Sequence, residues 1–129
     1  MWNDLGLLIL RAAFGFTMAF SHGLDKLMNY GTQAAQFPDP LGVGHEISMA
    51  LTIFAEFACA LSVGAGFLTR LTAIPIAITM LVAFGFIHMS DPWATKEAAF
   101  LYFAAFMCVI LLGPGKYSAD ALLFKKKKR

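Results

Sequence analysis

The sequence predicts an all-α integral membrane protein, a bundle of four transmembrane helices. Of its 129 residues, 59% are hydrophobic and only 14% are charged, whereas a typical soluble domain has about 45–50% and about 25%. The mean hydropathy is +0.69. A soluble domain of this length exposes a large share of its chain and could not bury so much apolar surface. The composition therefore disfavours a soluble enzyme, a nucleic-acid-binding module and a disordered linker.

Four segments are long and apolar enough to cross a hydrocarbon core about 30 Å thick. They cover about residues 5–24, 47–68, 71–89 and 98–112. The fourth is the shortest. A very short connection at Thr69-Arg70 joins the second segment to the third, and residues 90–97 join the third to the fourth. The spacing therefore predicts a simple up-and-down arrangement.

The connection between the first and second segments, residues 25–46, has the composition of a loop. Pro38 and Pro40 bias the backbone before them away from helix. We expect one transmembrane domain, residues 1–129, with an extracytoplasmic loop at 25–46 and a cytoplasmic tail at 113–129.

The basic residues predict the orientation of the chain. With an even number of spans, both termini lie on one side, which also holds Arg70, Lys116 and the run of basic residues at 125–129. The opposite loops hold only Lys26 and Lys96, among acidic residues. Both termini are therefore expected on the cytoplasmic side of the membrane. The net charge of +2 comes from this tail, so no basic surface for nucleic acid is predicted.

The first segment could instead be a cleaved signal peptide, with Ala19-Phe20-Ser21 as the cleavage site. However, its first four residues contain Asp4 and no Lys or Arg, and Arg11 interrupts the apolar region. Signal peptides begin with basic residues and have an uninterrupted apolar core. We therefore expect this segment to remain as a transmembrane helix.

Two ionisable residues lie well inside the predicted spans, Arg11 in the first and Glu56 in the second. Charges inside a bilayer are costly and usually face a partner. Counted at 1.5 Å per residue from His22 and Glu46, both lie about 15–16 Å deep. Matched depth predicts a buried Arg11–Glu56 ion pair. Such a pair either fixes only the helix register or frames a polar cavity for a ligand or proton, and both interpretations stay open.

The first helix also carries a polar stripe that leads toward Arg11. Its members, which fall within about 60° of one another around the helix, are Arg11, Gly15, Met18 and His22. Asp25 and Lys26 continue the stripe, which is either a ligand channel or a packing seam. The candidates for a cofactor- or ligand-binding site are therefore Arg11, Glu56, His22 and Lys26. No catalytic residue is predicted.

The histidines and cysteines give weaker signals. His22, His45 and His88 fall near the same predicted membrane surface, where they could form a metal site or a cluster that contacts a quinone. No His-x-x-His or Glu-x-x-His spacing occurs, so we predict no metal site. Cys59 and Cys108 could form a buried redox dithiol, but without a Cys-x-x-Cys motif two separate thiols are favoured.

Small residues recur at intervals of four in the first two helices. They are Gly15, Ala19 and Gly23 in the first and Ala58, Ser62 and Gly66 in the second. Small residues at this spacing let helices approach closely. We expect these faces to pack within the bundle, and contacts with another subunit are the alternative.

Five stretches, spread over essentially the whole chain, resemble the DoxX family of small four-helix bacterial inner-membrane proteins. They are Phe20-Ser-His22-Gly23-Leu-Asp-Lys26-Leu27, Phe37-Pro38-Asp39-Pro40-Leu-Gly42, Phe54-Ala-Glu56, Gly66-Phe-Leu-Thr69-Arg70 and Gly113-Pro114-Gly115-Lys-Tyr117-Ser118-Ala-Asp120. Each stretch is short, and together they are specific. The resemblance implies a four-helix bundle in the cytoplasmic membrane.

The resemblance also implies a functional context. The family takes its name from a subunit of an archaeal quinone-linked thiosulfate oxidoreductase, and other members are associated with oxidative or thiol stress and with soluble redox enzymes. The family is functionally mixed and has no agreed catalytic residue. Its recurrent polar positions correspond here to Arg11, His22, Lys26, Glu56, Thr69, Arg70, Tyr117 and Asp120.

Three functions remain in competition. The first is a subunit or accessory of a redox membrane system, linked to a quinone or to thiol and oxidative stress, with an aromatic wall of Phe14, Phe54 and Phe57 beside the ligand. If the protein is enzymatic at all, it is an oxidoreductase subunit. The second is a non-catalytic assembly or anchoring protein. The third, a small-molecule transporter, is less favoured because four helices leave little room for a gated path. Candidate partners besides the lipid bilayer are a membrane or soluble redox protein and a second copy of the chain.

Overall fold

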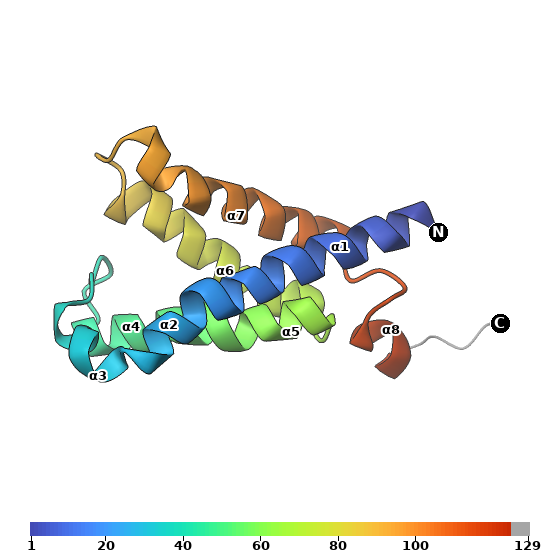
Figure 1. Cartoon of the computed structure of the whole chain (residues 1–129), viewed down its shortest axis with the longest axis horizontal. Helices are drawn as coiled ribbons and strands as arrows, with labels where there is room; N and C mark the ends of the chain where they lie inside the picture. The colour runs from blue at the N-terminus through green and yellow to red at the C-terminus, as the bar shows by residue number, and fades with distance from the viewer. Residues whose placement is uncertain (125–129) are drawn as a thin grey trace.

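The computed structural model describes residues 1–124, and within that range it contains helices and no strand. Four continuous helical runs are long and apolar enough to cross a membrane: Trp2–Met28, His45–Ala65, Thr69–Ile87 and Trp93–Leu112. The predicted membrane four-helix bundle is therefore confirmed. The N-terminus and α8 (Ala119–Leu123) lie at one end of the molecule, which we call the terminal end, and the longer loops lie at the opposite, loop end (Figure 1). The predicted basic tail, residues 125–129, lies outside the described residues.

Three of the four spans change from α-helix to π-helix along their length. The first consists of α1 (Trp2–Thr17), the π-helical η1 (Met18–Gly23) and α2 (Leu24–Met28). The second consists of α4 (His45–Ile53), the π-helical η3 (Phe54–Cys59) and α5 (Ala60–Ala65). The third joins α6 (Thr69–Val82) to the π-helical η4 (Ala83–Ile87), and the fourth is α7 (Trp93–Leu112). Short elements complete the chain: α3 (Tyr30–Gln33), the 3₁₀ turn η2 (Ala34–Gln36) and α8 (Ala119–Leu123).

The first and fourth spans are longer than the sequence predicted. The first continues to Met28 and not to residue 24, and the fourth begins at Trp93 and not at residue 98. Lys96 is accommodated in the first turns of α7 because its ammonium lies 5.0 Å from the centroid of the Phe84 ring and donates to the Met89 carbonyl at 3.3 Å. A long basic side chain can thus lie at a helix end with its stem on apolar surface.

The turn between the second and third spans lies earlier than predicted, at Gly66–Leu68 and not at Thr69-Arg70. Gly66 and Leu68 both have left-handed backbones, with φ of 78° and 46°. The carboxylate of Asp120 accepts hydrogen bonds from the amides of Leu68 (2.7 Å) and Thr69 (2.9 Å) and from the Thr69 hydroxyl (2.7 Å). Asp120, at the start of α8, therefore caps the N-terminus of α6 and ties the segment after the fourth span to the bundle.

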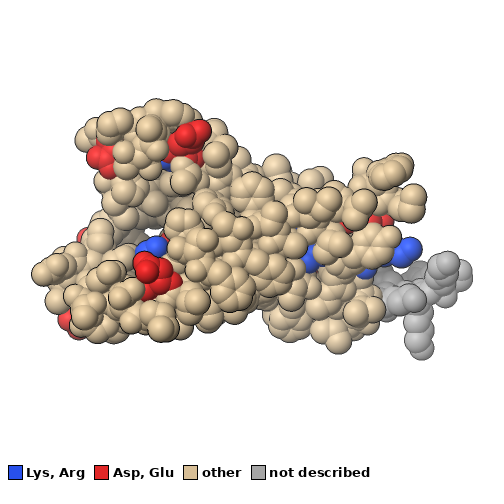
Figure 2. Space-filling model, viewed as in Figure 1, with Lys and Arg blue, Asp and Glu red and all other residues tan. Residues whose placement is uncertain are grey.

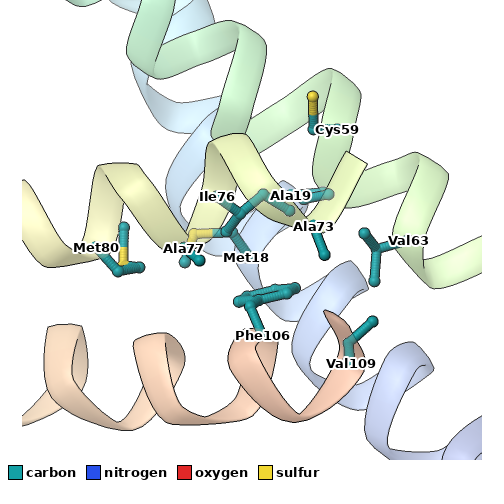
Figure 3. Packing of buried hydrophobic residues seen from close by; sticks show 11 residues of the cluster. Met18, Ala19, Cys59, Val63, Ala73, Ile76, Ala77, Met80, Phe106 and Val109 are labelled. Carbon is teal, nitrogen blue, oxygen red and sulfur yellow. The ribbon is translucent and has the colours of Figure 1, made fainter. Parts of the chain in front are cut away.

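The four spans form two pairs that diverge toward the loop end (Figure 1). The first and second spans pack along α1, α5, η1 and η3, and α6 packs along α7. The pairs meet nearer the terminal end, where α6 packs on α5 and η3 and α1 packs on α7. The core lies at this junction (Figure 3) and consists of Met18, Ala19, Cys59, Ala60, Val63, Ala73, Ile76, Ala77, Met80, Phe106 and Val109.

Glycines set the register between the first and second spans. A Cβ on Gly15 would lie 2.7 Å from the Gly64 amide nitrogen and 2.9 Å from the Ala60 carbonyl oxygen, and a Cβ on Gly23 would collide with the backbone of Glu56. The small-residue face of the first helix therefore packs within the bundle, as predicted. Its partner face is Glu56, Ala60 and Gly64. Of the predicted Ala58–Ser62–Gly66 face, Ala58 is exposed, whereas Gly66 is buried against Arg11 and Ser118.

We expect Gly15→Ala to lower the free energy of unfolding by about 1–3 kcal/mol, because the added methyl group must displace backbone atoms of the second span. Chemical unfolding in lipid–detergent micelles measures this effect. Gly6→Ala is the matched control in the same helix, because a Cβ there meets nothing within 4 Å. Equal stabilities of the two variants would contradict the close approach.

Candidate functional site

Arg11 is a buried structural link between three segments, and only 1% of its surface is exposed. Its guanidinium donates to the carbonyls of Val63 (3.4 Å) and Gly64 (3.1 Å), in the last turn of α5. It also donates to the carbonyls of Pro114 (2.8 Å) and Tyr117, in the segment that follows α7. The last carbonyls of a helix lack intrahelical partners and carry partial negative charge. The hydrogen bonds of Arg11 therefore go to backbone carbonyls and not to a carboxylate, and the Asp120 carboxylate lies within electrostatic range.

The predicted Arg11–Glu56 ion pair is wrong, because Glu56 pairs with Lys26. The Lys26 ammonium donates to the Glu56 carboxylate at 2.6 Å, and the two side chains are 24% and 5% exposed. Glu56 comes from η3, and Lys26 comes from α2, directly after η1. A charge inside the bilayer is paired, as expected, but its partner comes from nearer the loop end of the first span.

The register explains the exchange of partners. Gly15 lies against Gly64 and Gly23 lies against Glu56, so the residue level with Glu56 is Gly23 and not Arg11. An alignment of the two helices that places His22 level with Glu46 differs from the observed register by about 16 Å, or eleven residues at 1.5 Å each. The first helix continues to Met28, and this continuation brings Lys26 within reach of Glu56.

His22 contacts an aromatic residue of the fourth span, and that residue in turn interacts with this ion pair. Its ring makes an edge-to-face contact with Tyr102 of α7, with ring centroids 5.5 Å apart. The hydroxyl of Tyr102 is within electrostatic range of the Glu56 carboxylate. Three of the four predicted site residues, His22, Lys26 and Glu56, therefore lie in one neighbourhood, and Arg11 lies apart at the terminal end. Tyr102 is an added member that no sequence motif indicated.

A cavity of about 510 Å³ lies between the two diverging helix pairs. Its volume is typical of small-molecule sites, which span about 300–1,000 Å³. Its wall is mainly apolar, and Lys26 and Glu56 form a polar point in it. The lining residues are Lys26, Phe37, Pro38, Pro40, Leu41, Ser48, Leu51, Thr52, Phe54, Ala55, Glu56, Pro75, Ile78, Thr79, Val82, Ala83, Ile87 and His88. In Figure 2 the molecule is notched at the loop end, with charged side chains beside the notch and mainly uncharged residues in the middle.

The segment Phe37–Leu41 forms the side of the cavity nearest the loop end. Asp39 holds it in place, because its carboxylate accepts hydrogen bonds from the Ser48 hydroxyl (2.7 Å) and from the amides of Val43 (3.0 Å) and Gly44 (2.8 Å). The Ser48 hydroxyl, followed by these two amides, holds the pKa of the Asp39 carboxyl below its ordinary value against the opposing effect of desolvation. Asp39 therefore stays ionised and fastens this segment to the start of α4.

The other predicted polar groups are dispersed. His45 Nδ1 lies 2.5 Å from the Phe37 carbonyl, and His88 Nδ1, at the edge of the cavity, lies 2.8 Å from the Asp91 carboxylate. Among residues 1–124, no three His, Cys, Asp or Glu side chains are placed to hold a metal ion. Cys59 is buried and Cys108 is exposed, and both are free thiols.

Two of the three π-helical segments, η3 and η4, line the cavity, and the third, η1, packs on η3. A π-helical turn holds an extra residue, which changes the direction of the side chains that follow, and such turns are frequent at functional sites. Here η3 contributes Glu56 to the wall, and η4 contributes Ala83 and Ile87. Apolar periodicity does not distinguish a π-helix from an α-helix, so these segments cannot be predicted from the sequence pattern.

Charge exchange tests the pairing that the structure assigns. Lys26→Glu and Glu56→Lys should each lower stability by about 3–5 kcal/mol, because each leaves two like charges in the membrane. The double variant should recover part of this loss, and a double-mutant cycle on unfolding free energies in lipid–detergent micelles measures the coupling.

The pair Arg11→Glu with Glu56→Arg is the control for this experiment. Because Arg11 contacts carbonyls and not Glu56, we expect no recovery beyond the sum of the single effects. Recovery in this control, together with none for Lys26 and Glu56, would restore the pairing that the sequence suggested.

Comparison with known proteins agrees with the membrane fold. The chain is 34% identical over 130 residues to inner membrane protein YqjF of Escherichia coli, covering 96% of each chain. It is 31% identical over 122 residues to uncharacterized membrane protein Rv3486 of Mycobacterium tuberculosis, covering 77% of this chain and 75% of that protein. No solved structure matches it significantly. The profile of the DoxX family matches residues 6–89. The chain therefore belongs to the DoxX family and is a multi-pass bacterial inner-membrane protein.

Proposed function

We propose that the protein is a membrane subunit of a redox system and that the cavity binds a quinone beside the Lys26–Glu56 ion pair. The observation that supports this proposal is the position of a buried ion pair in the wall of a mainly apolar cavity of about 510 Å³. An ionisable pair inside a membrane span marks a functional site by default, since a purely structural contact could use uncharged groups at lower cost.

The polar point suits the ring of a quinone. Within the described residues, the Lys26 ammonium donates one hydrogen bond, to Glu56, although an ammonium has three N–H donors. A ring carbonyl oxygen can accept one of the others. Phe37 and Phe54 supply aromatic surface in the same wall, and edge-to-face or offset contacts with a flat ring are favourable.

A bound quinone would take up two electrons and two protons to become a quinol, with the electrons supplied by a redox partner. In this scheme Lys26 orients a ring oxygen, and Glu56 keeps Lys26 charged in an apolar wall. His22 and Tyr102, beside the pair, are further groups able to carry a proton. Arg11 has a structural role at the terminal end and takes no part in binding.

We also propose that both termini lie in the cytoplasm, with residues 25–46 on the outer side and residues 113–129 in the cytoplasm as parts of one transmembrane domain. The distribution of Lys and Arg supports this orientation. The cavity then lies in the outer half of the membrane. The electron donor is a membrane or soluble redox protein.

Quinone binding by the purified protein in nanodiscs tests the proposal. We expect wild type to bind a quinone with a ten-carbon tail above the level of empty nanodiscs, and Lys26→Met to weaken binding at least about tenfold. This loss corresponds to about 1.4 kcal/mol, near the lower end of the range for a hydrogen bond to a charged group. Calorimetric titration and mass spectrometry of co-purified lipids are the measurements.

Lys96→Met is the matched control, because Lys96 lies at the same end of the bundle and contacts Met89 and Phe84 outside the cavity. Its binding should equal that of wild type. Binding no greater than in empty nanodiscs would refute the quinone proposal. If a stable protein partner were then recovered by cross-linking in native membranes, the non-catalytic anchoring function would replace it.

A further inference from the structure

We propose that the cavity opens sideways into the lipid between α4 and α6, and that it takes a bilayer-resident amphiphile with one apolar chain and a compact head that accepts hydrogen bonds. This inference extends the proposed function by specifying the route and the ligand class, and the route does not depend on the head being a quinone. Three observations carry it: the exposed residues at the opening of the cavity, the mainly apolar segment at its loop end, and the inner position of the Lys26–Glu56 ion pair.

The residues at the opening of the cavity are exposed within the membrane spans. Leu51 and Phe54 of the second span and Ile78 of α6 all line the cavity, yet 54%, 55% and 55% of their surfaces are exposed. At 1.5 Å per residue, Leu51 lies about 9 Å from the start of its span at His45, and Ile78 lies about 14 Å from the end of its span at Ile87. An opening at this depth faces hydrocarbon and not water.

The side of the cavity nearest the loop end is mainly apolar, with His88 at its edge, and hydrogen bonds hold the segment that forms it. Phe37, Pro38, Pro40 and Leu41 form that side of the cavity, and the hydrogen bonds of Asp39 to Ser48, Val43 and Gly44 hold the segment to α4. A water-soluble ligand entering here would lose its hydration against apolar side chains, a cost of several kcal/mol for an unpaired polar group. A molecule that already resides in the bilayer bears no such cost.

The Lys26–Glu56 ion pair lies deep in the cavity, and this position orients the ligand. Glu56 is only 5% exposed, and on its helix it comes after Leu51 and Phe54, farther from the loop end. The head therefore reaches inward to Lys26, while the chain leaves between Leu51 and Ile78 into the surrounding lipid. A phospholipid head does not fit this arrangement, because a phosphate would have to leave the membrane surface for an apolar wall.

Tryptophan quenching tests the route without any ligand. Trp2 and Trp93 are replaced by Phe, and single Trp residues are introduced at Thr52 and Thr79, on the two facing walls. We expect both Trp residues to lose fluorescence in nanodiscs made with phospholipid brominated on its acyl chains and to be protected from aqueous iodide. Thermal unfolding shows whether each variant folds. If one variant does not fold, the other position keeps the test valid.

Two further positions calibrate the quenchers. Leu81→Trp lies on α6 outside the large cavity, at a half-exposed position in the span, and defines the effect of the brominated lipid. Val43→Trp, in the exposed loop, defines the effect of iodide. Quenching of the cavity positions by iodide and not by lipid would show an aqueous opening and overturn the proposal. Protection from both quenchers would show a closed cavity and overturn it equally.

Two quinones with the same ring, one with a tail and one without, then distinguish a failure of this inference from a failure of the proposed function. Since quinones quench Trp, the analogue with a ten-carbon tail should quench Thr52→Trp at lower concentration than the analogue without a tail. Lipid quenching without any effect of either quinone would retain the lateral opening and refute the quinone. Equal effects of both quinones with iodide quenching would retain the quinone and refute the lateral opening.

Discussion

The close approach of the first two spans determines where every buried charge finds its partner. Gly15 against Gly64 and Gly23 against Glu56 leave no space for a Cβ, so the two helices have one register. That register places Arg11 at the end of α5, where carbonyls lack intrahelical partners, and it places Lys26 beside Glu56. A displacement by a single helical turn would remove both sets of contacts and leave three charges without partners inside the bilayer.

The two charged centres are neutralised in different ways, and only the Lys26–Glu56 pair lines the cavity. Arg11 is 1% exposed, and its hydrogen bonds go only to carbonyl oxygens of α5 and of the segment after α7. It therefore closes the terminal end of the bundle, together with the Asp120 cap of α6. Lys26 and Glu56 instead line a cavity, and Lys26 is partly exposed. A charge that is both paired and accessible can respond to a ligand, whereas a fully enclosed one cannot.

Much of this arrangement could be predicted from residues alone. Apolar length identified four spans, and the cost of intramembrane charge identified Arg11 and Glu56 as special positions. The pairing failed because depth was counted from a boundary at His22, while the helix continues to Met28. The π-helical segments could not be predicted from the sequence, since π- and α-helices share the same apolar pattern over six residues. The place of Tyr102 beside His22 and Glu56 could not be predicted either, because it depends on how α7 crosses the first span.

The cavity follows from the same register. Tight contact at Gly15 and Gly23 holds the first pair of spans together, and the second pair meets it mainly near the terminal end, so the pairs diverge toward the loops (Figure 1). The central claim is therefore that Glu56 faces Lys26 in the membrane. Solid-state NMR in lipid bilayers measures it directly through the dipolar coupling between the Glu56 carboxyl carbon and side-chain nitrogens. We predict a strong coupling to the Lys26 ammonium nitrogen; a coupling to the Arg11 guanidinium in its place would contradict the register on which the account rests.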